Sequence, residues 1–365
     1  MWIELLRIGD LRCLAEAELA LAPGLNYLLG ANGAGKTSVL EAAYVISRGH
    51  SFRPGSRDTL IRRGAEGFQV FARVQHPGSE TSQKLGLERR PGVWAGRLDD
   101  RPLERLTDLF RRCAVCCFEP GSHELIAGPS ELRRSFLDWG VFHVEQDFLH
   151  QWRRYQSALK QRNALLRQDG PDAQLDAWDA ELDRWGQGIT SLRENYMRDF
   201  SRHFSALAQR LLPELPGASA RFAAGWNVDA GVDLAAQLLV NRPRDRQRQT
   251  TTVGPHRADW RPVFAELDAP AQLSRGQAKL TALAAVLAQA RCYRDSAGEW
   301  PVVLVDDLPS ELDLHHQDLL LGELVSAGVQ ALVSATELSP ALQTHRPRAR
   351  VFHVEQGRLR RDAGP

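Results

Sequence analysis

The spacing of hydrophobic and polar residues changes along the chain, and the first third is typical of strands. Residues 25–29 are mostly apolar and run directly into a glycine-rich stretch, which is followed at 37–47 by apolar residues at helical spacing. Residues 68–74 then alternate between apolar and polar, as a half-buried strand does, and 114–118 are apolar. We therefore predict strand, loop and helix at the start, followed by antiparallel strands with turns.

Between residues 130 and 212 the apolar period becomes helical. Aromatic and aliphatic residues recur from Phe136 to Leu166, and again from Leu175 to Tyr196, on either side of a break at Asp169-Gly170-Pro171. This pattern predicts helices that fold back on each other as a short antiparallel arm. Residues 242–248, which contain four arginines and a proline, are predicted to form a basic loop.

The last third returns to alternating helices and strands. Helices are expected at 274–291 and 315–327, buried strands at 301–305 and 329–333, and a closing hairpin at 352–359. The predicted division is into residues 1–125, the first part of an α/β domain; 126–215, a helical lobe; and 216–365, the second part of the α/β domain.

Composition restricts the function classes. The chain has 365 residues, 43% of them hydrophobic, enough for a sizeable core. A net charge of +1 excludes a bulk polycation, so any contact with nucleic acid must come from local patches. Five cysteines in such a length do not indicate a disulfide framework. No secretory signal or membrane-length apolar run is visible, and we expect a cytoplasmic protein with no membrane partner.

A phosphate-binding loop is the first candidate site. The stretch matches G-x-x-x-x-G-K-[ST] in full, between a strand and a helix, and comprises Gly30, Ala31, Asn32, Gly33, Ala34, Gly35, Lys36 and Thr37. Its backbone N–H groups are expected to surround the β-phosphate, Lys36 to neutralise phosphate charge and the Thr37 hydroxyl to ligate Mg²⁺. Ser38 completes the predicted ATP site.

Two carboxylates follow the apolar strand at 302–305. Asp306 is expected to be a Mg²⁺ ligand, directly or through water, and Asp307 to orient or deprotonate the attacking water. The alternative is a pair of acids that simply ends a strand. The phosphate loop upstream favours the catalytic interpretation.

A third motif precedes the predicted helix at 274–291. Leu273-Ser274-Arg275-Gly276-Gln277 is similar to the signature of ABC ATPases, in which a serine hydroxyl and a glycine N–H at a helix start make an anion site. Ser274, Gly276 and Gln277 are therefore predicted to bind nucleotide. The alternative is an ordinary helix N-cap, for which serine is well suited.

Other residues leave their alternatives open. The cysteines at 113, 116 and 117 lack a second pair at zinc-like spacing and are expected to be buried thiols. The turn at 254–257 is either structural or a contact with nucleic acid or another domain.

Candidate DNA contacts are Arg153, Arg154, Lys160, Arg162 and Arg167, with Arg242, Arg244, Arg246 and Arg248. These could equally be solvated charges, and the neighbouring Trp152 and Tyr155 are expected in the core rather than stacked on bases.

Three stretches between the phosphate loop and the signature resemble one protein family more specifically than the ATPase motifs do. Together with Asp306-Asp307 and the signature, they resemble the RecF family, bacterial recombination mediators related to the SMC ATPases; the stretches are residues 128–138, 155–163 and 253–259. The resemblance covers essentially the whole chain. It implies an ABC-type ATPase head, a P-loop NTPase fold, with an inserted helical lobe.

The resemblance also implies a mechanism and partners. Two copies would close on ATP and Mg²⁺, grip single-stranded and duplex DNA near the junctions of gaps, and reopen after slow, DNA-stimulated hydrolysis. RecR, with RecO, would be partners in loading the recombinase. Competing interpretations are an SMC-like structural ATPase, which needs longer coiled-coil arms, the ATP-hydrolysing subunit of a transporter, and a metabolic P-loop kinase, which has no use for the signature.

Two departures from the family pattern bear on catalysis. The run 118–125 is looser than in the family, so the residue that senses the γ-phosphate is not identified. ABC ATPases often place a histidine after the strand at 331–333, where this chain has Ser334-Ala335-Thr336. The missing histidine and the short Asp307 favour a slow ATPase that acts as a switch.

Overall fold

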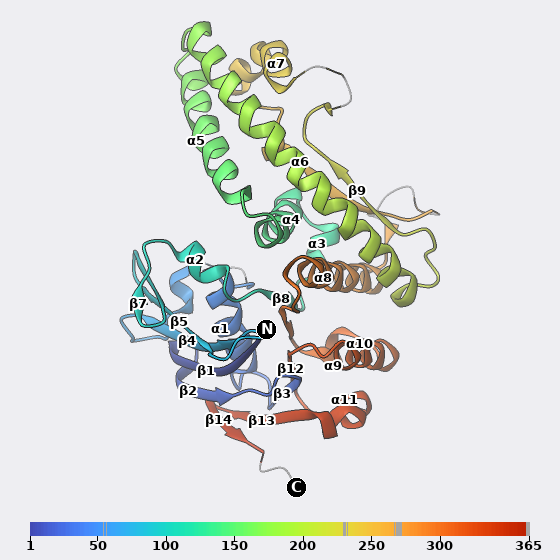
Figure 1. The fold of residues 1–365 in the computed structure, drawn as a ribbon. Coiled ribbons are helices and arrows are strands. Elements are labelled where there is room, and N and C mark those ends of the chain that lie inside the picture. The colour runs from blue at the N-terminus through green and yellow to red at the C-terminus, as the bar shows by residue number, and fades with distance from the viewer. Residues whose placement is uncertain are drawn as a thin grey trace. The chain divides into compact units, whose positions relative to one another are not determined.

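A computed structural model describes residues 1–53, 55, 57–228, 231, 233–265, 267 and 272–362. The chain forms two compact units: the first joins residues 1–122 to 293–365, and the second contains 123–292 (Figure 1). The division of the chain at residues 125 and 215, which the sequence predicted for the helical lobe, stays a prediction. Each unit is described by itself.

The first unit contains two six-stranded sheets. One is antiparallel, in the order β2-β1-β4-β5-β6-β7. Its strands are β1 (Trp2–Leu11), β2 (Leu14–Ala20), β4 (Phe68–Gln75), β5 (Gln83–Arg90), β6 (Val93–Leu98) and β7 (Arg101–Pro102). The alternation predicted at 68–74 is confirmed in β4, where alternate residues are buried.

The other sheet has the order β14-β13-β3-β12-β11-β8, and all its strands except the edge strand β14 run parallel. The strands are β3 (Leu25–Leu29), β8 (Val115–Phe118), β11 (Val302–Val305), β12 (Ala331–Ala335), β13 (Ala349–Glu355) and β14 (Arg358–Arg361). The central strands β3, β11 and β12 are buried along their whole length, as parallel strands covered on both faces are.

Helix α1 (Lys36–Arg48) packs against strands of both sheets. Eleven of its 13 residues are buried, so the helix is covered on every side rather than along one face. Helix α10 (Leu314–Ser326) is as long as α1. The other helices described in this unit are shorter: η1 (Arg57–Leu60), α2 (Leu106–Phe110), α9 (Leu308–Glu311), α11 (Pro340–His345) and η5 (Arg346–Arg348).

The second unit is mainly helical. Its elements are α3 (Glu124–Ala127), α4 (Ser130–Val144), α5 (Phe148–Arg167), α6 (Asp172–Leu211), α7 (Leu234–Arg248), η3 (Pro255–Arg257), the strand pair β9 (Ser219–Ala223) and β10 (Asp259–Val263), and most of α8 (Arg275–Ala297). Helices α5 and α6 lie side by side across the turn at 168–171, which confirms the predicted antiparallel arm (Figure 1). The chain does break between α4 and α5, so the first half of the arm is shorter than its apolar period indicated.

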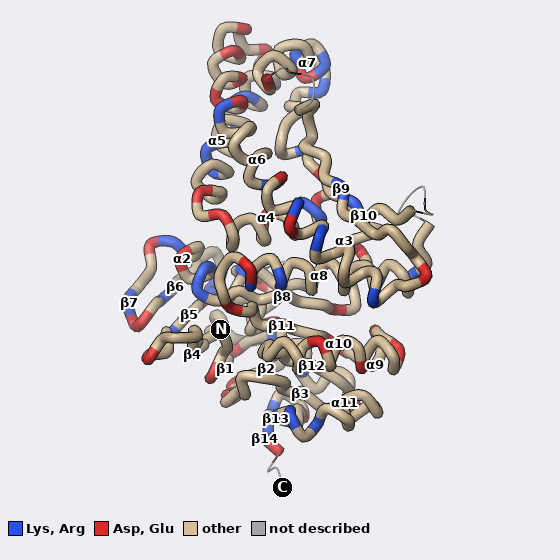
Figure 2. The backbone as a smooth tube through the Cα atoms, turned by 45° about the vertical axis from the view of Figure 1, so that its right-hand side comes forward, with Lys and Arg blue, Asp and Glu red and all other residues tan. Residues whose placement is uncertain are grey.

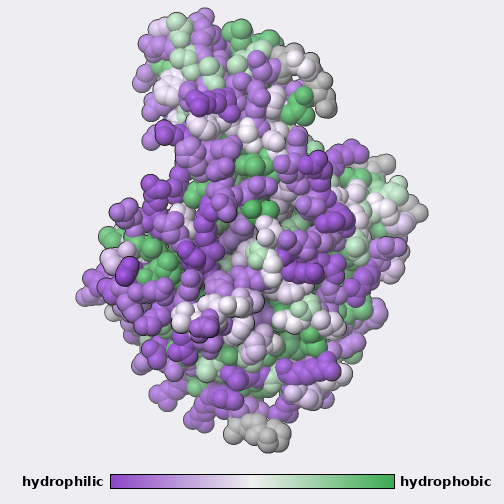
Figure 3. Space-filling model, viewed as in Figure 1, coloured by the Kyte–Doolittle hydropathy of each residue, from purple (hydrophilic) through white to green (hydrophobic). Residues whose placement is uncertain are grey.

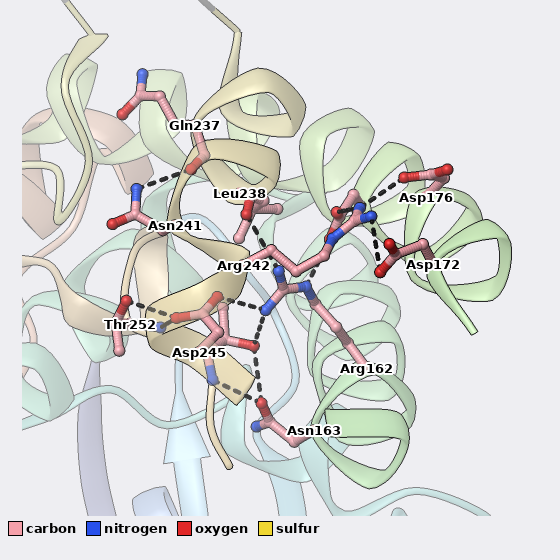
Figure 4. Close-up of polar contacts among 12 residues, drawn as sticks. Arg162, Asn163, Asp172, Asp176, Gln237, Leu238, Asn241, Arg242, Asp245 and Thr252 are labelled. Carbon is pink, nitrogen blue, oxygen red and sulfur yellow. Dashed lines mark hydrogen bonds and ion pairs between the residues drawn. The ribbon is translucent and has the colours of Figure 1, made fainter. Parts of the chain in front are cut away.

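The predicted basic loop at 242–248 is wrong, because these residues form the second half of α7. Arg242 is buried and pairs with Asp176 at 2.6 Å and Asp179 at 2.7 Å, both on α6 (Figure 4). Arg246 pairs with Asp169 and Asp172. The charges of Arg242 and Arg246, which the sequence left open as DNA contacts or solvated charges, are thus paired with acids that lie far earlier in the chain.

A second arginine, Arg162 of α5, is fully buried where α5, α6 and α7 meet. It donates to Asp179 at 2.5 Å, to Asp245 of α7 at 2.7 Å and to the Thr251 hydroxyl at 3.0 Å (Figure 4). The interpretation of Arg162 as a DNA contact is therefore wrong, because its guanidinium is enclosed by α5, α6 and α7.

The surface view in Figure 3 is largely hydrophilic, with apolar residues scattered across it. Among the helices of the described residues, none is long and apolar enough to cross a membrane.

Replacing Arg162 by leucine should destabilise the second unit strongly. The substitution leaves Asp245 fully buried without its arginine, and breaking a buried pair from one side costs about 3–5 kcal/mol. Thermal unfolding followed by circular dichroism would show a lower midpoint. Arg167→Leu, an exposed arginine of the same helix, is the matched control and should leave the midpoint nearly unchanged. Equal midpoints for the two variants would contradict a structural role of the cluster.

Candidate nucleotide site

The glycine-rich loop begins where β3 ends. At Gly30 a Cβ atom would lie 2.2 Å from the carbonyl oxygen of Val354 on β13, so any side chain there would push the loop away from the sheet. Gly35 is the N-cap of α1, with a left-handed φ of 116°. Only glycine lets the loop turn tightly into the helix while staying against β13.

Lys36 is the first residue of α1, and its side chain is almost completely buried. Its ammonium donates to the carbonyl oxygens of Gly30 at 2.6 Å and Ala31 at 3.0 Å, so it spans the mouth of the loop. Burial lowers the pKa of Lys36, and the charges of Asp307 and Asp306 only partly oppose this decrease. A lysine in this position can transfer its hydrogen bonds from loop carbonyls to phosphate oxygens.

Thr37 and Asp306 meet although they are 269 residues apart in the sequence. The Thr37 hydroxyl lies 3.1 Å from Oδ1 and 3.0 Å from Oδ2 of Asp306, which follows β11. Burial raises the pKa of Asp306, and hydrogen bonds from Ser334 and Thr37 oppose that rise. The predicted pair of metal ligands is thus brought into contact.

These two side chains suit a magnesium ion. Mg²⁺ prefers hard oxygen ligands and is commonly held in proteins by one or two carboxylates together with phosphate oxygens. A hydroxyl and a partly desolvated carboxylate, in contact and next to a buried lysine, provide that donor set. The residues therefore fit the metal that the sequence predicted.

Asp307 has an unusual backbone conformation. It lies in the left-handed region, with φ 53° and ψ 49°, at the start of α9. Its N–H donates to the Ser334 hydroxyl at 2.8 Å, and its carbonyl accepts from Ser310 N–H at 3.0 Å and Glu311 N–H at 3.2 Å. The local bonds fix the direction in which the second carboxylate leaves the chain.

The signature residues belong to the second unit. Ser274 Oγ accepts from the N–H of Gln277 at 3.2 Å, while Gln277 Oε1 accepts from the N–H of Ser274 at 3.0 Å. This reciprocal pair is a capping box at the start of α8. The alternative of a helix cap is therefore observed. It does not exclude an anion site, because Ser274, Arg275 and Gly276 are all exposed.

The loosened run after β8 is held by its own turn. The N–H of Glu119 donates to Ser122 Oγ at 2.8 Å, and the N–H of Gly121 donates to the Glu119 carboxylate at 2.6 Å. Glu119 follows β8, the strand next to β11, so it starts at the same edge of the sheet as Asp306.

Sequence reasoning missed a group of polar residues beside the loop. Glu41 of α1 is fully buried and accepts two bonds from Arg12, at 2.8 and 3.1 Å, and one from Ser51 at 2.5 Å. Arg53 lies 3.9 Å from the same carboxylate, and its charge opposes the rise that burial causes in the pKa of Asp306. A glutamate within the apolar run 39–46 of the helix was the signal in the sequence.

Ser334 stood out in the sequence only as part of a segment lacking a histidine. The structure places its side chain, which is fully buried, 2.6 Å from Asp306 Oδ1. A single polar residue in the apolar strand 331–335 was the available signal.

The candidate DNA contacts separate into two groups: Arg162, Arg242 and Arg246 pair with acids of the same unit, whereas the others, including Arg244 and Arg248 of α7, are exposed. On α5, Arg153, Arg154, Lys160 and Arg167 are exposed, and the helix contains no acidic residue (Figure 2).

Tyr155 is fully buried, and its hydroxyl bonds to His256 Nδ1 at 2.7 Å, so the expectation that this aromatic residue belongs to the core is confirmed. Burial lowers the pKa of His256 to about 4, so this histidine is neutral within the unit.

The three cysteines near residue 115 lie on or beside β8. Cys113 and Cys116 are buried, and burial raises the pKa of each thiol to about 12. Such thiols remain protonated at neutral pH, which agrees with the expected structural role.

The chain matches known sequences over its whole length. Residues 2–360 match the RecF/RecN/SMC N-terminal domain family. The DNA replication and repair protein RecF of Stenotrophomonas maltophilia is 48% identical over 366 residues, covering 98% of this chain and 99% of the relative. RecF of Xanthomonas axonopodis pv. citri is also 48% identical, covering 100% and 99%. RecF of Shewanella oneidensis is 35% identical, covering 97% and 98%.

Solved structures share the fold. The recombination mediator protein RecF in the RecFOR pathway, solved with ATP, has a TM-score of 0.88 at 23% identity and covers 99% of each chain. An SMC head bound to the C-terminal winged-helix domain of ScpA has a TM-score of 0.58 at 16% identity, covering 99% of this chain and 97% of the other. The predicted fold class, an α/β ABC-type ATPase head with an inserted helical lobe, is therefore confirmed.

Replacing Gly30 by alanine should weaken nucleotide binding by roughly tenfold or more, equivalent to about 1.4 kcal/mol, because the new Cβ displaces the loop from β13. Titration with a fluorescent ATP analogue would measure the decrease in affinity. Gly322→Ala in α10 is the matched control: its Cβ meets nothing within 4 Å, and alanine favours a helix by about 0.5–1 kcal/mol. Wild-type affinity in Gly30→Ala would contradict the close packing of the loop.

Proposed function

This chain belongs to the RecF family of DNA replication and repair proteins, and we propose that it acts as an ATP-dependent DNA clamp in recombinational repair. Its fold and family make it an ATPase. The observation that carries the proposal is the contact between Thr37 and Asp306, which joins the phosphate loop to the acid after β11. The proposal assigns ATP to residues 30–38, which surround the lysine and the threonine.

Within this site the residues have distinct proposed roles. Lys36 neutralises the β- and γ-phosphates once it leaves the loop carbonyls. Thr37 and Asp306 hold Mg²⁺, which when bound neutralises developing phosphate charge. Asp307 orients the attacking water. An aspartate is shorter than a glutamate in this position, and the following segment provides Ser334 rather than a histidine, so hydrolysis is slow and acts as the release step of a switch.

The proposed dimer depends on the signature. Ser274 and Gly276 are exposed at the start of α8, where helix N–H groups favour an anion, and we assign to them the γ-phosphate bound by a second copy. ATP can close a dimer only by binding the closed form more tightly. Shifting such an equilibrium from 1:99 to 99:1 takes about 5.5 kcal/mol, which two shared nucleotides could supply.

The proposed DNA contact is the basic face of α5. Its exposed cations are suited to the phosphate backbone, which attracts proteins without regard to sequence. From the family we further propose binding near the junctions of single-stranded gaps in duplex DNA, in the cytoplasm, where recombinase loading takes place. RecR, with RecO, are the proposed protein partners, since the similar RecF structure belongs to the RecFOR pathway.

ATP with Mg²⁺ should convert the protein from monomer to dimer in light scattering, and gapped DNA should bind the dimer. Lys36→Arg tests the loop, and Ser274→Arg should remain monomeric. Ser274→Asp separates two roles of the serine: it retains a good helix cap but repels phosphate, so it should fold normally and fail to dimerise. A monomeric wild type that hydrolyses ATP with DNA present would indicate a self-contained P-loop enzyme instead.

Charge reversal on α5 tests the DNA contact. Lys160→Glu with Arg167→Glu should weaken binding to gapped DNA, and for every phosphate that is no longer neutralised the negative slope of log K against log salt should become less steep by about 0.9. Arg198→Glu with Arg202→Glu on α6 changes the net charge equally and is the control. Fluorescence anisotropy at several salt concentrations would measure both. Equal salt slopes in the two variants would place the DNA contact away from α5.

A further inference from the structure

The two halves of the nucleotide site lie at the ends of strands that are not neighbours. The phosphate loop follows β3 and the acids follow β11, while β12 lies between these strands in the sheet. Ser334 of β12 is level with Leu28 of β3, and the preceding Val333 is level with Val305 of β11. Ser334 is therefore the residue of the intervening strand that lies beside the acids.

The hydrogen bonds of Ser334 have a determined direction. A backbone N–H can only donate, so the N–H of Asp307 donates to Ser334 Oγ at 2.8 Å. The serine proton is then directed to Asp306 Oδ1, at 2.6 Å. One fully buried hydroxyl thus connects the side chain of the first acid to the backbone of the second.

We propose that Ser334 is a positioning residue of the ATPase site, which sets Asp306 and Asp307 together. The proposal rests on the function assigned above to the two acids. It goes beyond that function, since it explains how a strand end without the histidine of other ABC ATPases still contributes to the site.

The Ser334 hydroxyl makes the two carboxylate oxygens of Asp306 inequivalent. Oδ1 of Asp306 accepts from Ser334 at 2.6 Å and also lies 3.1 Å from the Thr37 hydroxyl. Of these two hydroxyls, only that of Thr37 contacts Oδ2, at 3.0 Å. The oxygen less occupied by protein donors is Oδ2, and it is the one presented to a cation or its water. Outer hydrogen bonds of this kind orient metal-binding carboxylates and tune their affinity.

For Asp307, the hydroxyl supports a strained backbone. A left-handed conformation is uncommon for a residue other than glycine and persists when surrounding bonds enforce it. Ser334 holds the N–H side of this residue, while Ser310 and Glu311 of α9 hold its carbonyl. The same hydroxyl therefore links the metal-binding carboxylate to the first turn of α9.

Packing alone does not require a hydroxyl at this position. The other residues of β12 are Ala331, Leu332, Val333 and Ala335, all apolar and buried. An alanine at 334 would fill the strand but leave the Asp307 N–H without this acceptor. The hydroxyl is thus accounted for by the two acids.

The test compares Ser334→Ala with Ser334→Thr, which keeps the hydroxyl. Binding of a fluorescent ATP analogue would be titrated with Mg²⁺, and again in EDTA, alongside steady-state ATP hydrolysis. Ser334→Ala should raise the Mg²⁺ concentration for half-maximal binding by about tenfold, the lower end of the effect of outer-shell substitutions. It should also lower kcat, while nucleotide affinity in EDTA stays at the wild-type value.

Rescue by threonine and an unchanged nucleotide affinity in EDTA distinguish positioning from general stability. Ser334→Thr should restore the Mg²⁺ dependence, and the exposed Thr336→Ala should match wild type throughout. A wild-type Mg²⁺ dependence in Ser334→Ala would overturn the inference, as would an equal decrease of affinity with and without Mg²⁺. If the wild-type protein itself binds nucleotide without any effect of Mg²⁺, the proposed function of Asp306 fails instead.

Discussion

The burial of α1 between two sheets is the constraint on which the nucleotide site depends. The helix packs against β1, β4 and β5 of the antiparallel sheet and β8 and β12 of the parallel one, and nearly all its residues are buried. A helix covered on every side can neither rotate nor slide without disrupting the close packing of its apolar side chains. Its N-terminus, which carries Lys36 and Thr37, is therefore fixed against the ends of the parallel strands.

Arginine–aspartate pairs play the corresponding part in the second unit. The three stretches on which the family resemblance rested meet there: Arg133 of the first pairs with Asp259 of the third at 2.7 Å, and Tyr155 of the second bonds to His256 of the third. Buried ion pairs of this kind are costly to break from one side, and in this unit they join α5, α6 and α7. The residues most specific to the family thus form a polar framework inside the unit.

The sequence predicted elements well where the apolar period was clear. Strand β3 was predicted at its observed bounds, and the helices at 37–47 and 274–291 lie within or almost within α1 and α8. It failed at α7, where Pro243 and four arginines suggested a loop. The acids that neutralise Arg242 and Arg246 lie on α6 and the turn before it, and no local pattern connects residues so far apart.

The sequence by itself predicted the chemistry proposed for the site, because the phosphate loop, the two acids after an apolar strand and the signature are local patterns whose residue types suit one ligand. The tertiary structure alone decided which residues meet. Thr37 reaches Asp306, and Ser334 joins both acids, because parallel strands bring distant segments to one edge of a sheet. Strand order and register depend on packing across the whole unit, which no short stretch of sequence contains.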